Sequence, residues 1–372
     1  MRAHHLLTLV LAAACSEPKI EPEDSTPAAD SGGVEADDTG VDADDTDASD
    51  DTAADDTAAD DSSADDSAAD DSAVDDSGAD DTGLPEHPTE PPEIPIYSGG
   101  TCPTLIGGPT RDEALITGFI SDGVEREFRL MVPERYDGVT PMPLVFGWHW
   151  LNSSSSSFIR EGDVETAIEE MGFIGVFPDD LEGQYLFNWP FFEEGTAAES
   201  ELVFFDDLLA CITDQYAIDL TQIHGVGVSA GALWVTYLST TERVNHLASV
   251  TSLSGGLGDG YGIWAMDWVP QARKFPAMVL NGGPTDWFVL DFHAASERYR
   301  DELLADGHYV TWCEHDAGHA VPPFEAPPDH DTTFYSMWQH MFDHPYGLEA
   351  GASPYLTDGL NPDLPEWCEI AY

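Results

Sequence analysis

The chain has 372 residues and is strongly acidic, with 72 Asp and Glu against 12 Lys and Arg and a net charge of -60. Because nucleic acid carries a negative backbone, we do not expect it as a partner. Residues 16–95 hold 29 of the acidic side chains and too few large apolar residues to bury a core. The length therefore favours one sizeable folded domain, which we place at residues 96–372.

The first 15 residues have the pattern of a secretory signal. Arg2 precedes an apolar run from Leu6 to Leu11, which is too short to span a membrane as a helix. Cys15 follows three alanines and resembles the acylated cysteine of a bacterial lipobox, with Ala12 where leucine is usual. We therefore expect export and a lipid anchor at Cys15, on the bacterial outer membrane or cell surface. Ordinary cleavage nearby, with Cys15 discarded or free, is the alternative.

Residues 16–95 predict a disordered acidic tether. Asp pairs recur every five residues from Asp50–Asp51 to Asp80–Asp81, a period that matches neither a helix nor a strand. Charge repulsion would extend the segment to on the order of 50 Å or more.

Four further cysteines form an even set that an oxidising compartment would pair: Cys102, Cys211, Cys313 and Cys368. Three pairings are possible. A bridge from Cys102 to Cys368 would join the two ends of the domain and leave Cys211 to pair with Cys313, and we take this pairing as the working hypothesis.

The domain alternates short apolar runs with helical patterns. The expected strands are Ala114–Ile120 and Glu127–Val132, as an opening hairpin, followed by Pro143–Trp148, Gly172–Phe177, Gln222–Gly227, Ala248–Leu253, Ala277–Leu280 and Tyr309–Trp312. The expected helices are Val164–Met171, Glu201–Tyr216, Ala230–Ser239 and Phe288–Ala305. Continuous apolar strands alternating with helices predict an α/β fold, with a mostly parallel sheet between two helical layers.

The pentapeptide Gly227-Val-Ser-Ala-Gly231 carries the clearest chemical signal. It joins an expected strand to an expected helix, which is the setting of a nucleophile elbow. Small residues at both ends leave room for the sharp turn, and Ser229 would stand at the positive end of the helix. Ser229 is therefore the candidate nucleophile.

A serine nucleophile needs a histidine base and an acid, in the chain order serine, acid, histidine. His319 follows the expected strand Tyr309–Trp312 in a loop that contains Gly318, and it is our candidate base. His315 competes with it, and the two histidines imitate a zinc-protease motif. Gly318 and Pro322 argue against the helix that such a motif requires, so we expect no metal.

Asp286 is the candidate acid because it follows strand Ala277–Leu280 at the carboxyl edge of the sheet. Asp259, Asp291 and Asp316 are the alternatives.

An oxyanion hole requires two backbone donors. One is the N–H of Ala230, and the other is the N–H of Trp150 or Leu151 in the loop after Pro143–Trp148. Serines 153–157 follow in the same loop, and we interpret them as flexible loop rather than as nucleophiles.

Between residues 100 and 345 the chain resembles secreted esterases grouped as polyhydroxybutyrate depolymerases, feruloyl esterases and acetyl xylan esterases. The resemblance lies in Pro143–His149, Gly172–Pro178, Trp189 and Gly225–Gly231. It implies an α/β-hydrolase fold and a triad of Ser229, Asp286 and His319. Trp150 departs from the glycine that usually follows the histidine of the oxyanion loop.

Aromatic side chains lie in several loops expected near the active site, and Trp148, Trp189 and Trp287 are candidates to line the substrate pocket. The function we expect is hydrolysis of a carboxylic ester, polymeric esters included, without a cofactor. A binding or adhesion protein that retains the fold without catalysis is one alternative, and a serine peptidase is another because the same triad cleaves amides.

Overall fold

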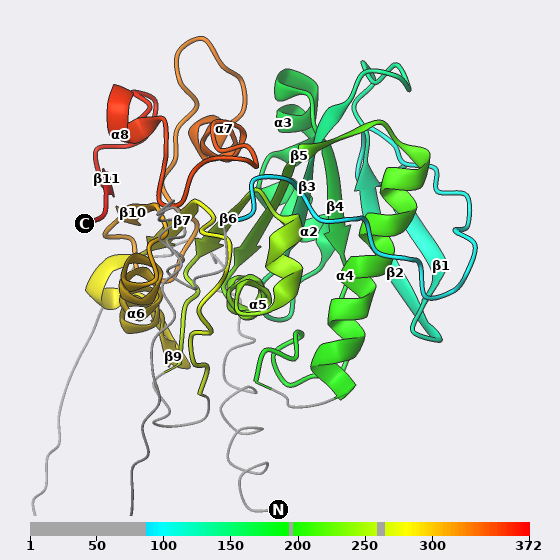
Figure 1. Cartoon of the computed structure of the whole chain (residues 1–372), viewed down its shortest axis with the longest axis horizontal. Coiled ribbons are helices and arrows are strands. Elements are labelled where there is room, and N and C mark those ends of the chain that lie inside the picture. Colours follow the sequence, from blue (N-terminus) through cyan, green and yellow to red (C-terminus); the bar gives the residue numbers. More distant parts are fainter. Residues whose placement is uncertain (1–86, 193–195, 259–264) are drawn as a thin grey trace, which may run out of the picture. The chain divides into compact units, whose positions relative to one another are not determined.

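The computed structural model describes residues 87–192, 196–258 and 265–372 (Figure 1). The predicted signal, Cys15, almost all of the predicted tether and Asp259 lie outside these residues. The tether was expected to reach residue 95. However, His87 bonds the Leu348 carbonyl oxygen at 3.0 Å, and Ile94 packs against the core. The packed part therefore begins before residue 96.

A nine-stranded sheet forms the centre of the described part, in the order β1-β2-β4-β3-β5-β6-β7-β10-β11. The strands β4, β3, β5, β6, β7 and β10 run parallel, and β1, β2 and β11 pair antiparallel at the edges. The bounds are β1 Leu115–Ser121, β2 Val124–Met131, β3 Met142–Trp148, β4 Ile174–Pro178, β5 Ile218–Val228, β6 Ser249–Leu253, β7 Ala277–Asn281, β10 Val310–Glu314 and β11 Cys368–Ile370. The predicted α/β class and the opening hairpin are confirmed.

Helices cover both faces of this sheet (Figure 1). Their bounds are α2 Ser155–Glu161, α3 Val164–Met171, α4 Thr196–Gln215, α5 Ala230–Ser239, α6 Phe292–Ala305, α7 Tyr335–Phe342 and α8 Tyr355–Asp358, with short 3₁₀ turns at Glu242–His246 and Gly283–Thr285. Two-residue strands β8, Trp287–Phe288, and β9, Leu290–Asp291, make a separate hairpin.

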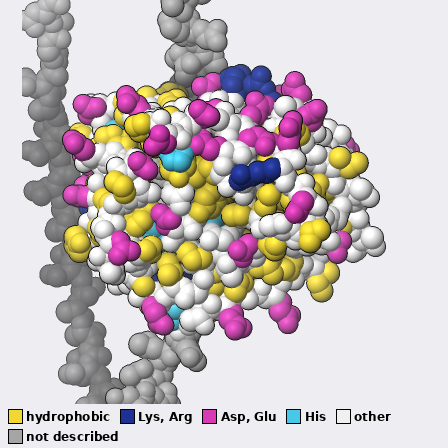
Figure 2. All heavy atoms as spheres, turned by 90° about the horizontal axis from the view of Figure 1, so that it is seen from above, with side chains coloured by type: hydrophobic (Ala, Val, Ile, Leu, Met, Phe, Trp, Pro, Cys, Tyr) yellow, Lys and Arg dark blue, Asp and Glu magenta, His cyan; other side chains and the backbone are white. Residues whose placement is uncertain are grey.

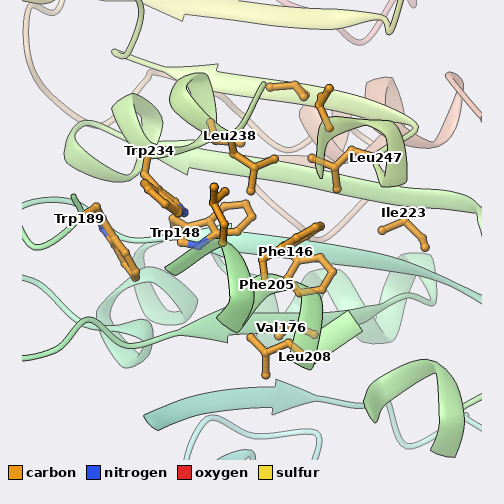
Figure 3. Packing of buried hydrophobic residues seen from close by; sticks show 14 of the residues in the cluster. Phe146, Trp148, Val176, Trp189, Phe205, Leu208, Ile223, Trp234, Leu238 and Leu247 are labelled. Atoms are coloured by element: carbon orange, nitrogen blue, oxygen red, sulfur yellow. The ribbon is translucent and has the colours of Figure 1, made fainter. Parts of the chain in front are cut away.

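Alternating strand residues divide the core into two layers. Leu144 and Phe146 of β3 pack with α4, α5 and α6, in the layer that Figure 3 shows from close by. Val145, between them, faces the other layer with α2, α3 and α7. Side chains that alternate along a strand lie on opposite faces, so strands apolar at every position are buried on both sides. This is the three-layer arrangement predicted from the sequence.

Two expectations about local structure were wrong. The serine run was expected to be flexible loop, yet serines 155–157 open α2, and the Ser154 hydroxyl accepts a hydrogen bond from the Ser157 N–H as an N-cap. Serine is a weak helix former but a favoured cap, so composition alone pointed away from a helix. The helix expected at Phe288–Ala305 begins at Phe292, because the β8–β9 hairpin occupies its first residues.

The disulfides also differ from the working hypothesis. Cys102 pairs with Cys211, and Cys313 pairs with Cys368. Cys313 and Cys368 are register partners across β10 and β11, which brings their Cα atoms to 4.0 Å. Nearness to the ends of the chain was a poor guide because β11 returns to the sheet beside β10.

Acidic side chains are scattered over the face shown in Figure 2, with few Lys and Arg between them. Among the residues that the structure describes, no helix is long and apolar enough to cross a membrane.

Three neighbouring histidines are fully buried: His224 on β5, His340 on α7, and His344 just after α7. His224 bonds Ser249 and Gln222, His340 bonds Thr311, and His344 bonds Ser353. Burial lowers the pKa of His224 to about 3 and of His344 to about 4, and their mutual repulsion acts in the same direction on His224. These side chains are therefore neutral in the folded protein at neutral pH.

The low pKa of His224 makes stability depend on pH. Unfolding restores a pKa near 6.5, so the unfolded chain binds one more proton than the folded chain between about pH 6 and pH 4. This contribution to stability is complete above pH 6.5 and is lost as the pH falls. We expect the free energy of unfolding of His224→Gln to change less steeply than that of the wild type, by about 1.4 kcal/mol per pH unit in this window. Urea titrations at several pH values measure both slopes, and identical slopes would contradict the assignment.

Candidate active site

Ser229 lies at the turn between β5 and α5, as predicted. Its backbone has φ 55° and ψ -115°, a conformation that L-residues rarely adopt. The Ser229 N–H donates to the Leu253 carbonyl oxygen at 2.9 Å, and its own carbonyl accepts from the Leu233 N–H at 2.9 Å. The strained serine is thus held from both sides, by β6 and by the first turn of α5.

Two glycines make this turn possible. A Cβ atom on Gly227 would lie 2.1 Å from the Gly231 carbonyl oxygen, and a Cβ on Gly231 would lie 2.1 Å from the Trp148 carbonyl oxygen. Such contacts are closer than real Cβ atoms allow, so the backbones of β5, α5 and the loop after β3 can meet only through glycine.

His319 lies within hydrogen-bond distance of Ser229. The Ser229 Oγ and His319 Nε2 atoms are 2.9 Å apart, and His319 Nδ1 is 2.7 Å from Asp286 Oδ1. Because the carboxylate can only accept, His319 Nδ1–H donates to Asp286, and Nε2 is left to accept from the serine hydroxyl. The three residues predicted as nucleophile, base and acid form one continuous chain of hydrogen bonds.

Asp286 is fully buried and has further donors. The Ser254 hydroxyl and the Gly282 N–H each lie 2.8 Å from its second oxygen. Burial would raise the pKa of Asp286, but the hydrogen bonds from His319, Gly282 and Ser254 outweigh burial and lower the pKa below its usual value. The side chain is therefore a carboxylate at neutral pH. Ser254 was not predicted, and its sequence position at the end of β6 was the available signal.

Aromatic residues from the β8–β9 hairpin and from the start of α6 pack against the imidazole of His319. Phe288 and Phe292 stack on the His319 ring, with centroid distances of 5.8 Å and 4.3 Å. Val289 turns the hairpin with φ 63°, a strained value for a β-branched residue. Of the alternatives to Asp286, Asp291 caps α6, where its side chain accepts from the Ala294 N–H. His315 is buried beside Trp367.

An apolar cavity of about 360 Å³ opens beside Ser229 and His319. Its walls come from the loop after β3, from α2, from the chain after His319 and from α7, and include Trp150, Leu151, Phe158, Phe288, Val321, Phe334, Met337 and Trp338. Glu161 is the one carboxylate among the described residues that line it. The volume suits a small organic group.

The predicted pocket tryptophans were wrong for this cavity. Trp148 and Trp189 are buried in the core, where Figure 3 shows both, and Trp287 is 64% exposed on the hairpin. Trp148 is the last residue of β3 and belongs to the core, and Trp287 lies on the β8–β9 hairpin outside the cavity lining. Phe334, Met337 and Trp338 were missed because α7 was not predicted.

The expected oxyanion donors lie next to the nucleophile. Ala230 is the first residue of α5, so its N–H has no partner within the helix. Trp150 and Leu151 share the cavity wall with Ser229. Within residues 87–372, apart from the two undescribed gaps, no group of three His, Cys, Asp or Glu side chains could hold a metal ion.

Solved structures share this architecture. Native pOPH aligns with a TM-score of 0.56 and 15% sequence identity, over 73% of this chain and 96% of that one. With the strand order and the elbow described above, this similarity shows that the chain has the α/β-hydrolase fold.

Two curated relatives match part of the chain. The chain is 27% identical to feruloyl esterase D of Neurospora crassa over 159 residues, which are 42% of this chain and 52% of the relative. It is 25% identical to the probable feruloyl esterase C of Aspergillus terreus over 150 residues, or 38% of this chain and 52% of that one. The match thus spans about half the length of each relative. No family model matches the chain.

The close approach at Gly231 yields a stability prediction. Gly231→Ala must push apart two backbones and is expected to cost about 3 kcal/mol of stability. Gly225→Ala is the matched control, since its Cβ would meet the ends of Leu247 and Val235 side chains at 3.0 and 3.3 Å, which can move. Urea unfolding of both variants should show the larger loss for Gly231→Ala, and equal losses would contradict the account of the elbow.

Proposed function

We propose that this chain is an exported carboxylic ester hydrolase. The observation that carries the proposal is the hydrogen-bonded chain of Ser229, His319 and Asp286 at the wall of an apolar cavity. The α/β-hydrolase fold and the partial similarity to feruloyl esterases support the same reaction class.

In the proposed reaction the Ser229 Oγ attacks the carbonyl carbon of the ester. His319 Nε2 accepts the hydroxyl proton and returns it to the leaving alkoxide, so that the alcohol departs and an acyl-enzyme is left. Asp286 orients the imidazole and stabilises its protonated form. Water, activated by His319, then cleaves the acyl-enzyme and releases the acid.

The negative charge that develops on the carbonyl oxygen requires donors fixed in advance. We assign this role to the N–H of Ala230 and to an N–H of the loop after β3, from Trp150 or Leu151. These groups are part of the backbone, and the reaction needs no cofactor.

The cavity favours an uncharged, apolar acyl group. Aromatic and aliphatic side chains form most of its wall, and the strongly negative chain would disfavour a carboxylate. Feruloyl or acetyl esters of polysaccharides and polyhydroxyalkanoates are the substrate candidates, polymeric ones included.

We also propose that the enzyme works outside the cytoplasm. The signal pattern, the lipobox-like Cys15 and the acidic segment that follows suit a lipid-anchored domain held clear of a bacterial surface. Two disulfides within the described residues are consistent with an oxidising compartment.

Replacing Ser229 by Ala tests the nucleophile. We expect turnover of a short-chain aryl ester to fall by at least about 10⁴-fold. The urea unfolding midpoint should stay close to that of the wild type, which shows that the variant is folded. Ser156→Ala, from the serine run in α2, is the matched control and should keep wild-type activity. Activity retained in Ser229→Ala would remove the assignment.

A substrate and label profile separates the alternatives. A fluorophosphonate probe should modify the wild-type protein, whereas a binding protein that lacks catalysis would stay unmodified. Rates on aryl, feruloyl and acetyl esters, on hydroxybutyrate oligomers and on a peptide amide then distinguish an esterase from a peptidase.

Met337 tests the role of the cavity. Met337→Ala should enlarge the cavity and raise the kcat/KM ratio of a bulky aromatic ester to an acetyl ester, by about 10-fold for a few lost methylene contacts. Met341→Ala lies one turn further along α7, equally buried but not among the cavity residues. Both variants should lose about 2–5 kcal/mol of stability, and only Met337→Ala should change selectivity. Equal selectivity in the two variants would show that the acyl group binds elsewhere.

A further inference from the structure

Two successive peptide groups in the loop after β3 are held by buried side chains. The Trp189 indole N–H donates to the His149 carbonyl oxygen at 2.9 Å, and His149 Nδ1 donates to the Trp150 carbonyl oxygen at 2.9 Å. The Ser153 N–H also donates to the Trp150 carbonyl, at 3.2 Å. These bonds hold the carbonyl oxygens of two peptide groups. The N–H atoms of the same two groups, on Trp150 and Leu151, are the candidates for the oxyanion hole.

Holding a carbonyl also aims the next N–H. In a planar trans peptide the C=O of one residue and the N–H of the following residue point in opposite directions. The bond from Trp189 to the His149 carbonyl therefore sets the direction of the Trp150 N–H. The bond from His149 to the Trp150 carbonyl sets the direction of the Leu151 N–H in the same way.

Both side chains are anchored deep in the protein. Trp189 and His149 are fully buried, and their rings lie 5.0 Å apart between centroids. Figure 3 shows Trp189 beside Trp148 and Trp234, within the core layer that also holds α5. A donor in such surroundings has little freedom to move, so the carbonyl that it holds is fixed as well.

The chain after β4 braces the same loop from outside. Asp180 Oδ1 lies 3.4 Å from His149 Nε2, and Asp180 Oδ2 accepts from the Asn188 amide at 2.8 Å. Asn188 in turn accepts from the Asn152 N–H at 2.7 Å. Residues 180–189 thus contact the loop at two of its residues, His149 and Asn152.

The position of this loop also fixes its distance from the nucleophile. Gly231 of α5 packs so closely on the Trp148 and His149 carbonyls that no Cβ would fit. Ala230, the other candidate donor, precedes Gly231 directly. A rotation of the loop peptides would therefore change the relation between the two donors.

We propose that Trp189 and His149 are positioning residues that fix the two peptide groups carrying the Trp150 and Leu151 N–H atoms, one of which donates to the oxyanion of the reaction. The inference rests on the proposed function, because it assigns these amides to the transition state of ester cleavage. It also gives Trp189, one of the residues that carry the resemblance to the esterases, a physical role other than lining the substrate pocket.

An oxyanion contact strengthens when charge develops and so acts on kcat more than on KM. Trp189→Phe keeps an aromatic ring in the core and removes the indole N–H together with part of the ring system, a loss of volume that the control below shares. We expect kcat on an aryl ester to fall about 10- to 100-fold with KM within about twofold, and the affinity of a boronic acid that mimics the tetrahedral state to fall in parallel.

Trp268→Phe is the matched control. It also removes an indole hydrogen bond, here a 3.3 Å bond to Asp306 away from the cavity, and should leave kcat unchanged. Rates are divided by the concentration of sites that a fluorophosphonate labels, so that misfolded protein does not lower the calculated kcat. Equal kcat in wild type and Trp189→Phe would overturn the inference.

Asn188→Gly supplies a second test that does not disturb the core. Asn188 has φ 68°, which glycine adopts freely, so the change removes the brace on Asn152 and Asp180 without backbone strain. We expect kcat to fall about 3- to 10-fold with KM unchanged. Failure of the proposed function would appear differently, as a wild type without esterase activity or a Ser229→Ala variant that retains it.

Discussion

The close contact between the start of α5 and the strands β3 and β5 is the constraint on which the site depends. Gly227 and Gly231 let three backbones meet where a single Cβ would collide, and Ser229 is left in a strained conformation that β6 and α5 hold in place. Strain of this kind persists only where the surrounding structure enforces it. The same contact places the nucleophile and the first amide of α5 beside the end of β3 and the loop that follows it.

Around this point, polar groups are paired in a mostly apolar setting. Asp286 is buried, yet three donors keep it ionised, and Phe288 and Phe292 stack on the imidazole that it orients. The cavity beyond is mostly apolar, and Glu161 is the one carboxylate among the described residues that line it. In such surroundings fixed hydrogen bonds act more strongly than they would in water, which suits the stabilisation of a developing charge.

The parts of the structure that sequence predicted have local causes. Apolar runs and the Gly-x-Ser-x-Gly turn depend on neighbouring residues, so the parallel strands, α3, α5 and the order of Ser229, Asp286 and His319 could be read from them. The rest depends on long-range contacts. The pairing of Cys313 with Cys368 follows from β11 joining β10, and the cavity wall depends on α7, whose residues meet the site only after the chain folds back. The inward direction of Trp189 is likewise set by a bond to a carbonyl 40 residues away.

Trapping the acyl-enzyme tests the central claim most directly. An aryl ester is mixed with the wild-type protein, the reaction is stopped with acid within the first turnovers, and the digested protein is analysed by mass spectrometry. The account predicts at most one acyl group per chain, on Ser229, and a loss of this labelling when His319, which accepts the Ser229 proton, is replaced by alanine. Steady turnover with no acyl group on Ser229, or with the group on another residue, would contradict it.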